Sequence, residues 1–330
     1  MFKFLPVRYI GLLLSSFLLF ACAASDKQPE WVDSSSGQFP ASQYLTAVGE
    51  GGNRETAASR ARANLSKIFQ VAISDTSQDF SQAIVASKSG QSNVENQQRV
   101  MRFVTADAQQ LLEGSNVVEY WESPAGQIFG LAALDKAAAS RRFMAAVNKA
   151  DRDTAQLIDY ASNVAPNPVV ALQALESARL SQVERDNANR NLAITAGKGI
   201  NARIDLNTIE AMIREALATL TFAVVAVDSD LQAELQGAVS SLGIQASAVS
   251  NYQLVGDLDL EPLQQKQGWW WLRGSLELKL MDGDHAIVKQ RWPVKASSVD
   301  QGMVGQRLAD SINSKLAVYL YQMLTVTSVK

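Results

Sequence analysis

An apolar run near the N-terminus ends in Cys22, the only cysteine of this 330-residue chain. Residues 9–21 are mostly apolar and follow a start made positive by Lys3 and Arg8. A helix needs about 20 apolar residues to span a bilayer, so this run is too short to do so. Its length and flanks are typical of the hydrophobic part of a secretory signal. We therefore expect residues 1–21 to be a signal peptide and the mature chain to begin at Cys22.

The end of the run, Leu19-Phe20-Ala21-Cys22, resembles the lipobox of bacterial lipoproteins. The resemblance implies that the signal is cut before Cys22 and that the cysteine carries two or three acyl chains, which hold a protein stably on a membrane. Ala23 and Ala24 follow without an aspartate, and in Gram-negative lipoproteins this pattern implies the outer membrane, on its periplasmic face. The alternative is an ordinary secretory signal in which Cys22 is incidental. A lone cysteine leaves no disulfide inside the chain.

Composition places the mature chain among globular proteins. Apolar residues make up 47% of the sequence, which is normal for a chain that builds a core. The net charge of the full chain is −3. Removal of the signal removes the cations Lys3 and Arg8, so the net charge of the mature chain is −5. No basic block suits nucleic acid, and no later apolar run is long enough to span a membrane. Residues 22–30 are polar and indicate a short tether from the lipid to the first domain.

The first domain is expected over residues 31–150. A strand at 43–49 leads through a glycine-rich turn to Asn53, a good N-cap for a helix that runs to about residue 69. Extended segments follow, and a hairpin turn at 123–126 separates the last two of them. The extended segments lie at 71–73, 99–112, 116–121 and 127–134.

A helical segment at 151–199 is expected to link the first domain to a second one at 200–330. In the second domain a strand and a helix precede three antiparallel strands and a final amphipathic helix, with Asp282-Gly283 as the turn of the last hairpin. The order of strand, helix, three antiparallel strands and helix repeats that of the first domain. The predicted fold class is therefore α+β, with two small units joined by a helical hairpin.

Several segments of the first domain resemble one known family. They are Trp31-Val32, residues 44–51, the alanine-rich helix 55–65, and the strand–hairpin–strand from 118 to 136. Together they resemble the Lpp twenty-kilodalton outer-membrane lipoprotein family, over about residues 30–150. The resemblance implies a small outer-membrane lipoprotein, in some members flagellum-associated, and it supplies no catalytic residues. The second half is similar, in layout only, to envelope lipoproteins that activate penicillin-binding proteins, and layout is a poor guide to function.

No group of residues predicts catalysis, a cofactor or a metal site. His285 is the only histidine and lies on the hairpin turn, where a triad or a zinc site would need further partners. The neighbouring Asp282 and Asp284 lack the spacing of an EF-hand calcium loop. Asp257 and Asp259 share a strand face without a sign of a cleft. The glycine turn at 49–52 lacks the lysine and hydroxyl residue of a phosphate loop.

The run Trp269-Trp270-Trp271 is the most unusual feature of the mature chain. In a strand, Trp269 and Trp271 point to one face and Trp270 to the other. Either both faces are covered and the run is a core strand, or the run forms an exposed aromatic patch that binds a partner, since aromatic residues are enriched at interfaces. Arg273 and Trp292 are expected on the same sheet, and aromatic rings also suit the sugars of peptidoglycan.

The anchor and the two α+β units together predict a non-enzymatic outer-membrane lipoprotein that binds envelope partners. The partner would belong to flagellar structures or to the wall-synthesis machinery, where the protein would act as a regulator of peptidoglycan synthesis. A cell-wall hydrolase is the competing enzymatic hypothesis, and a plain structural tether is a third. The sequence does not name the partner or the oligomeric state.

Overall fold

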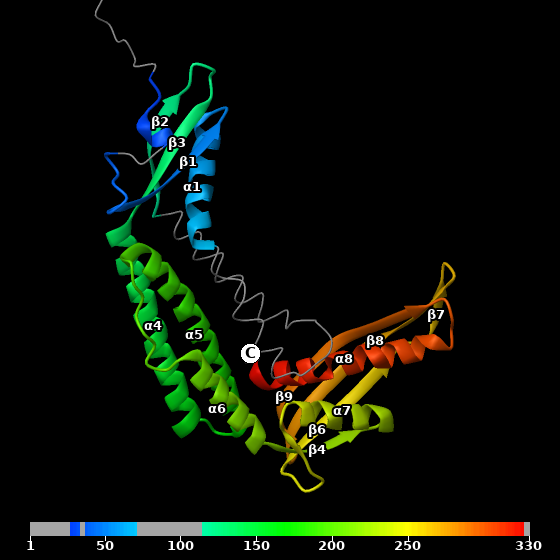
Figure 1. The fold of residues 1–330 in the computed structure, drawn as a ribbon. Coiled ribbons are helices and arrows are strands. Elements are labelled where there is room, and N and C mark those ends of the chain that lie inside the picture. The colour runs from blue at the N-terminus through cyan, green and yellow to red at the C-terminus, as the bar shows by residue number, and fades with distance from the viewer. Residues whose placement is uncertain (1–26, 34–36, 71–113, 327–330) are drawn as a thin grey trace, which may run out of the picture. The chain divides into compact units, whose positions relative to one another are not determined.

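The computed structural model of the chain describes residues 27–33, 37–70 and 114–326 (Figure 1). The described residues form two compact units: residues up to 68 and residues 114–137 make the first, and residues 69–70 and 138–326 make the second. Cys22, most of the predicted tether and the predicted strands at 71–73 and 99–112 lie outside the described residues. Each unit combines helices with strands, which confirms the α+β class. Within the described ranges, no helix has both the length and the apolarity needed to cross a membrane.

The first unit is a three-stranded antiparallel sheet in the order β1-β3-β2. Helix α1 packs on one face of β1, and the short 3-10 helix η1, whose Trp31 is buried, contacts β3. The predicted strands at 116–121 and 127–134 are confirmed as β2 and β3. The bounds are η1 (Glu30–Val32), β1 (Tyr44–Gly51), α1 (Arg54–Gln70), β2 (Asn116–Glu122) and β3 (Ile128–Asp135).

A glycine and two alanines allow α1 to lie directly on β1. A Cβ atom added to Gly49 would come within 2.1 Å of the backbone nitrogen of Ala61 and 2.6 Å of the carbonyl oxygen of Ala57. Ala57 and Ala61 are themselves fully buried. Backbone therefore packs against backbone at this point, so a larger residue at Gly49 would push the helix away from the sheet.

Local signals in the sequence place the ends of these elements correctly. The side-chain oxygen of Asn53 accepts a hydrogen bond from the backbone N–H of Thr56 at 2.8 Å, which confirms the predicted N-cap. The N–H of Gly126 donates to the carbonyl of Ser123 at 2.8 Å, with φ of 79° at Gly126, which confirms the hairpin turn. Asn167 caps the helix that begins at Pro168 in the same way.

Three helices open the second unit: α4 (Lys136–Asn163), α5 (Pro168–Ala196) and α6 (Leu206–Thr219). Side-chain bonds hold α4 and α5 together as a hairpin, because Ser140 near the start of α4 donates to Thr195 near the end of α5 at 2.9 Å. Helix α5 also packs on α6 and on the last helix, and its residues Leu172 and Leu175 belong to the main hydrophobic core. The segment 151–199 therefore contributes α5 to the core of the second unit.

The second sheet contains a parallel part and an antiparallel part. Strand β4 pairs in parallel with β5 and β6, while β6, β8 and β9 form an antiparallel meander, with β7 paired to the start of β8. The predicted order of strand, helix, three antiparallel strands and helix is confirmed, with β5 and β7 as short additions. The bounds are β4 (Thr221–Ala226), α7 (Ser229–Ser241), β5 (Gln245–Ala246), β6 (Tyr252–Leu260), β7 (Gln264–Lys266), β8 (Trp269–Asp282), β9 (His285–Ser298) and α8 (Met303–Thr325).

One face of this sheet forms the core with helices α5, α6, α7 and α8. Alternate residues of a strand point to the same face, and Leu276, Leu278 and Leu280 of β8 are fully buried there. The apolar stripe predicted for the last helix is confirmed, because every member is buried on α8. Its members are Val304, Leu308, Ile312, Leu316, Leu320 and Met323.

Candidate partner-binding surface

The odd-numbered residues of β8 point away from the core, and we call that side of the sheet the open face. The register of the β8–β9 hairpin sets which residues of β9 lie opposite them on the same face. Most of these residues of β9 are basic, so the open face is polar where the helix-covered face is apolar. They are Lys289, Arg291, Pro293, Lys295 and Ser297.

The register divides the predicted tryptophan patch between the two faces. Trp269, Trp271 and Arg273 are odd-numbered and belong to the open face. Trp270 lies on the helix-covered side, together with Trp292, which is paired with the buried Leu276. The ring of Trp292 stacks on Tyr319 of α8, with centroids 4.6 Å apart. The predicted five-residue surface is thus brought together only in part.

None of the three consecutive tryptophans is a buried core residue. Trp269 is 44% exposed, and Trp270 and Trp271 are half-buried. They precede the stretch of β8 that packs in the core, close to the tight β7–β8 turn in which Gln267 and Gly268 both have positive φ. Part of the aromatic surface of this run is therefore accessible to solvent.

Arg273 lies beside the half-buried ring of Trp271 on the open face. Its guanidinium carbon is 5.5 Å from the ring centroid, within the range of a cation–π contact. Across the hairpin, Arg273 is paired with Lys295, and both side chains are exposed. An aromatic plane and two cations are thus available together to a ligand.

Further along the same face, three cations surround the carboxylate of Glu277, whose residue is only 3% exposed. Lys279 Nζ lies 2.7 Å from Oε1, while Lys289 Nζ and Arg291 Nη2 lie 3.0 and 2.9 Å from Oε2. Hydrogen bonds from Lys279, Lys289 and Arg291 lower the pKa of Glu277 to about 2, although burial opposes this shift. Glu277 is therefore ionised at neutral pH.

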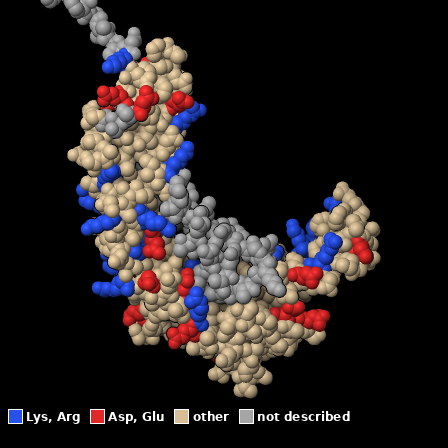
Figure 2. All heavy atoms as spheres, in the orientation of Figure 1, with Lys and Arg blue, Asp and Glu red and all other residues tan. Residues whose placement is uncertain are grey.

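Sequence reasoning missed this cluster, for which the sequence holds only part of a signal. Lysine and arginine recur at odd positions on both sides of the predicted Asp282-Gly283 turn. The turn pairs Asp282 with His285, so only the register shift between Leu280 and Met281 brings odd positions of both strands onto one face. In Figure 2, basic and acidic side chains lie next to one another on the arm of the second unit that carries β7, β8 and β9. The acidic neighbours of the cluster on β6 are Asp257 and Asp259, which are exposed.

The other residues considered from the sequence do not assemble into a site. His285 is exposed beside the two-residue turn of the β8–β9 hairpin, opposite Asp282. Within the described part of the chain, no cluster of histidine, cysteine, aspartate and glutamate has a geometry that suits a metal ion. The glycine-rich stretch at 49–52 completes β1 and turns into α1.

A groove of about 600 Å³ lies at the free edge of β1 in the first unit. Its floor includes Val32, Val48 and Phe129. Two side chains of α1 close the edge, because Asn64 donates to the carbonyl of Val48 at 2.9 Å and Arg60 donates to that of Glu50 at 3.0 Å. These bonds occupy backbone oxygens that an added strand would need, so they protect the edge.

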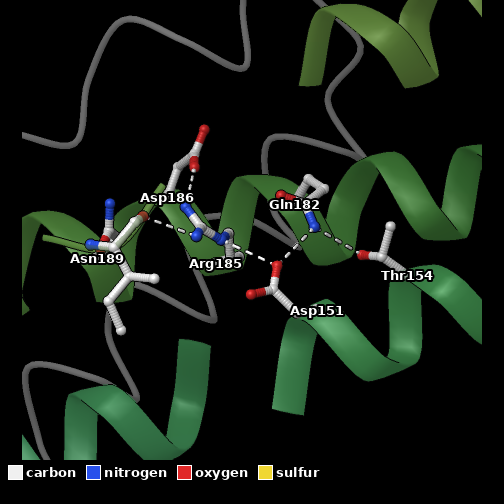
Figure 3. A network of polar contacts seen from close by, with 7 residues as sticks. Asp151, Thr154, Gln182, Arg185, Asp186 and Asn189 are labelled. Carbon is white, nitrogen blue, oxygen red and sulfur yellow. Dashed lines mark hydrogen bonds and ion pairs between the residues drawn. The ribbon is translucent and has the colours of Figure 1, made fainter. Parts of the chain in front are cut away.

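A buried ionic network joins α4, α5 and the segment after α5 (Figure 3). Arg185 is 2% exposed, and its Nε donates to Asp151 of α4 at 3.0 Å. Its Nη2 donates to the carbonyl of Ile200 at 2.8 Å, while Gln182 donates to Thr154 at 3.0 Å. The network ties α4 to α5 and to the chain that leaves α5.

A second buried group connects α5 to α8. Arg179 binds Glu176 through two hydrogen bonds of 2.8 Å, and the hydroxyl of Tyr321 donates to Glu176 at 2.9 Å. Burial raises the pKa of Tyr321, and the adjacent carboxylate raises it further. For Arg179, burial lowers the pKa, but the charge and hydrogen bonds of Glu176, together with the charges of Tyr321 and Glu210, raise it above its ordinary value. The hydroxyl and guanidinium therefore stay protonated, and the contact anchors α8.

A family model matches the N-terminal region of the chain. Residues 29–135 match the model of the LPP20 lipoprotein family, which confirms the resemblance seen in the sequence. No curated protein sequence matches the chain significantly.

Solved structures that match parts of this chain include two bacterial lipoproteins and one secreted protein. A crystal structure described as a lipoprotein from Caulobacter crescentus CB15 is 19% identical, with a TM-score of 0.26, over 34% of this chain and 90% of its own. A minor lipoprotein from Acinetobacter baumannii is 18% identical, with a TM-score of 0.26, over 32% and 89%. The secreted protein HP1454 from Helicobacter pylori is 11% identical, with a TM-score of 0.45, over 84% and 97%.

Proposed function

We propose that this protein is a non-catalytic lipoprotein, acylated at Cys22 and held on the periplasmic face of the outer membrane, where it binds other envelope components. Two observations support the anchor: the signal-like run that ends in the lone cysteine, and the LPP20 lipoprotein match that begins seven residues beyond it. Its partners are flagellar structures or the wall-synthesis machinery, and its role is assembly or regulation.

One observation carries the binding role: the open face combines accessible tryptophan with arginine. Trp271 and Arg273 contact one another, and both are available to a partner. Tryptophan and arginine are the residue types that most often contribute large binding energies at interfaces. Trp270 and Trp292 would support this surface from the other side of the sheet.

Metabolic labelling with an alkyne analogue of palmitate tests the anchor. Wild type should be labelled and recovered with outer-membrane fractions, while Cys22→Ala should lose the label and leave the membrane. Equal labelling of both proteins would refute acylation at Cys22.

Capture after cross-linking in cells tests the binding role and identifies the partner by mass spectrometry. Trp271→Ala should reduce the yield of the cross-linked partner, with a loss of about 2 kcal/mol or more if the ring is a hot spot. Tyr160→Ala removes another exposed aromatic ring of the same unit and is the matched control. This variant should not reduce the yield of the cross-linked partner. Equal capture by both variants would remove the open face from the binding site.

A further inference from the structure

The β8–β9 part of the open face carries more positive charge than its own carboxylate neutralises. Three cations converge on Glu277, which supplies a single negative charge. Arg273 and Lys295 add two further cations beside Trp271. The side chains of Lys289 and Arg291 are 52% and 53% exposed, so they keep donors facing solvent. A partner with negative charge would complement this surface.

Glu277 shows which chemical group this surface accepts. Its carboxylate receives a lysine on one oxygen and both a lysine and an arginine on the other, at 2.7 to 3.0 Å. These are the distances of charge-assisted hydrogen bonds. Lysine and arginine each carry several donors, so the same groups can also hold a carboxylate from another molecule.

The neighbouring strand limits where such a partner can lie. Asp257 of β6 is paired with Glu277, and Asp259 is paired with Ser275, so the β6 side of the face is acidic. A negatively charged partner is attracted to β8 and β9 and repelled from β6. The binding region is therefore a strip along the hairpin that ends at Trp271.

Addition of a strand to the edge of β9 does not explain these residues. Backbone groups of alternate residues on an edge strand point outward. Pro293 has no N–H to offer there, and the carbonyl of Ser297 already accepts a hydrogen bond from Arg307 of α8 at 3.0 Å. Two positions of the edge are therefore unavailable to an added strand, as is common for exposed strands. The side chains on the open face offer a partner the alternative surface.

The spacing of the cations suits a polypeptide. Lys289 and Arg291 occupy alternate positions of one strand and are about 7 Å apart, while Lys295 lies four positions beyond Arg291, at about 13 Å. Carboxylates on alternate residues of an extended chain repeat at the same interval. Tryptophan and arginine are also the residue types enriched at protein interfaces.

We propose that the open face binds an acidic protein segment, whose carboxylates are held by Lys289, Arg291 and Lys295 while an adjacent apolar side chain packs on Trp271. This inference rests on the proposed function, because it names the chemistry of the partner that the surface captures. Glu277 competes with the partner for Lys289 and Arg291, so it limits the affinity.

The test is binding of fluorescent poly-L-glutamate to the full mature chain, measured by anisotropy at low and at physiological salt. Replacing both Lys289 and Arg291 by glutamate should weaken binding by about tenfold or more, and higher salt should weaken wild-type binding. The control replaces Lys198 and Arg203 by glutamate, which changes the net charge equally at exposed positions of the same unit. It should cause a much smaller loss.

Glu277→Gln gives the decisive result, because it should strengthen poly-L-glutamate binding by removing the internal competitor. A residue that served only the fold would not raise affinity when replaced. If the double reversal fails to fold by circular dichroism, Lys289→Ala with Arg291→Ala takes its place. Equal losses in the double variant and its control, or no gain with Glu277→Gln, would overturn the proposal.

Two further ligands separate acidic protein from other anions. Purified peptidoglycan and vesicles containing anionic phospholipid are tested in the same way. Tighter binding to either ligand than to poly-L-glutamate, if it is lost when Lys289 and Arg291 are replaced by glutamate, would overturn the assignment to protein.

Cross-linked capture in cells distinguishes failure of the acidic-partner proposal from failure of the proposed function. Capture that depends on Trp271 but not on the cations refutes only the acidic partner, whereas absence of any captured partner refutes the proposed function.

Discussion

The two faces of β8 show how one strand serves two purposes. On the helix-covered face, Leu276, Leu278 and Leu280 are fully buried and contribute to the core. On the open face the intervening positions carry Glu277 and Lys279, and the stability of that side depends on ionic contacts near water. Because burial of apolar area contributes far more than a solvent-exposed ion pair, substitutions on the two faces should differ in kind.

The largest effect is expected for Leu278→Ala. Leu278 is fully buried, so truncation leaves a cavity and should lower the free energy of unfolding by about 2–5 kcal/mol. Lys295→Ala, an exposed position of the open face, should change it by less than about 0.5 kcal/mol. Urea unfolding of both variants measures this, and similar losses would contradict the division into two faces.

A smaller but still clear difference is expected between two tryptophans. Trp292→Ala removes the stacking on Tyr319 and should cost about 2 kcal/mol or more, because the ring packs against the core. Trp271→Ala should cost about 1 kcal/mol or less, since its ring is half-buried on the open face. Thermal melts measure both losses. A larger loss of stability for Trp271→Ala than for Trp292→Ala would contradict the assignment of the core to the helix-covered face.

Acid should reveal the ionic cluster. The pKa of Glu277 falls from its ordinary value of 4.5 to about 2 in the folded chain, so ionised Glu277 stabilises the fold fully above pH 4.5. That contribution is lost as the pH falls from about 4.5 towards 2. Glu277→Gln should therefore be less stable than wild type at neutral pH, and the difference should narrow in acid. A difference that stays constant over this range would show that the cations do not act through its charge.

The last comparison, of Arg273→Ala with wild type, is expected to show a small effect. The substitution removes a cation–π contact with Trp271 at an exposed site, which is worth about 0.5–1 kcal/mol. Arg273→Lys retains the charge and is the matched control. Intrinsic tryptophan fluorescence together with urea unfolding gives the result, and a loss as large as that of Leu278→Ala would mean that Arg273 is part of the core.

Features that depend on neighbours in sequence were predicted correctly. Asn53 and Asn167 cap their helices as expected, because a cap needs only a side chain and the backbone three residues later. The Asp282-Gly283 hairpin and the apolar stripe of α8 follow from turn chemistry and from helical period. The alternation of the tryptophans between two faces likewise follows from strand geometry.

Features that depend on distant pairs were not predicted. The ion pair of Asp151 with Arg185 requires the packing of α4 on α5, and the contact of Glu176 with Tyr321 joins residues 145 positions apart. The groove at the edge of β1 was also missed, because it forms only when α1 lies against the sheet. No sequence pattern within a single helix or strand indicates these two contacts or the groove.

By itself, the sequence determined the α+β class, the order of most elements, the strand alternation that separates Trp270 from Trp271, and the expectation of a lipid at Cys22. These follow from local backbone preferences and from periodicity. Only the tertiary structure decided which face of β8 the helices cover, and that cations from both strands of a hairpin meet at Glu277. The period of a strand predicts that β8 has two faces. The register of the sheet and the packing of α8 determine which of these faces remains open to a partner.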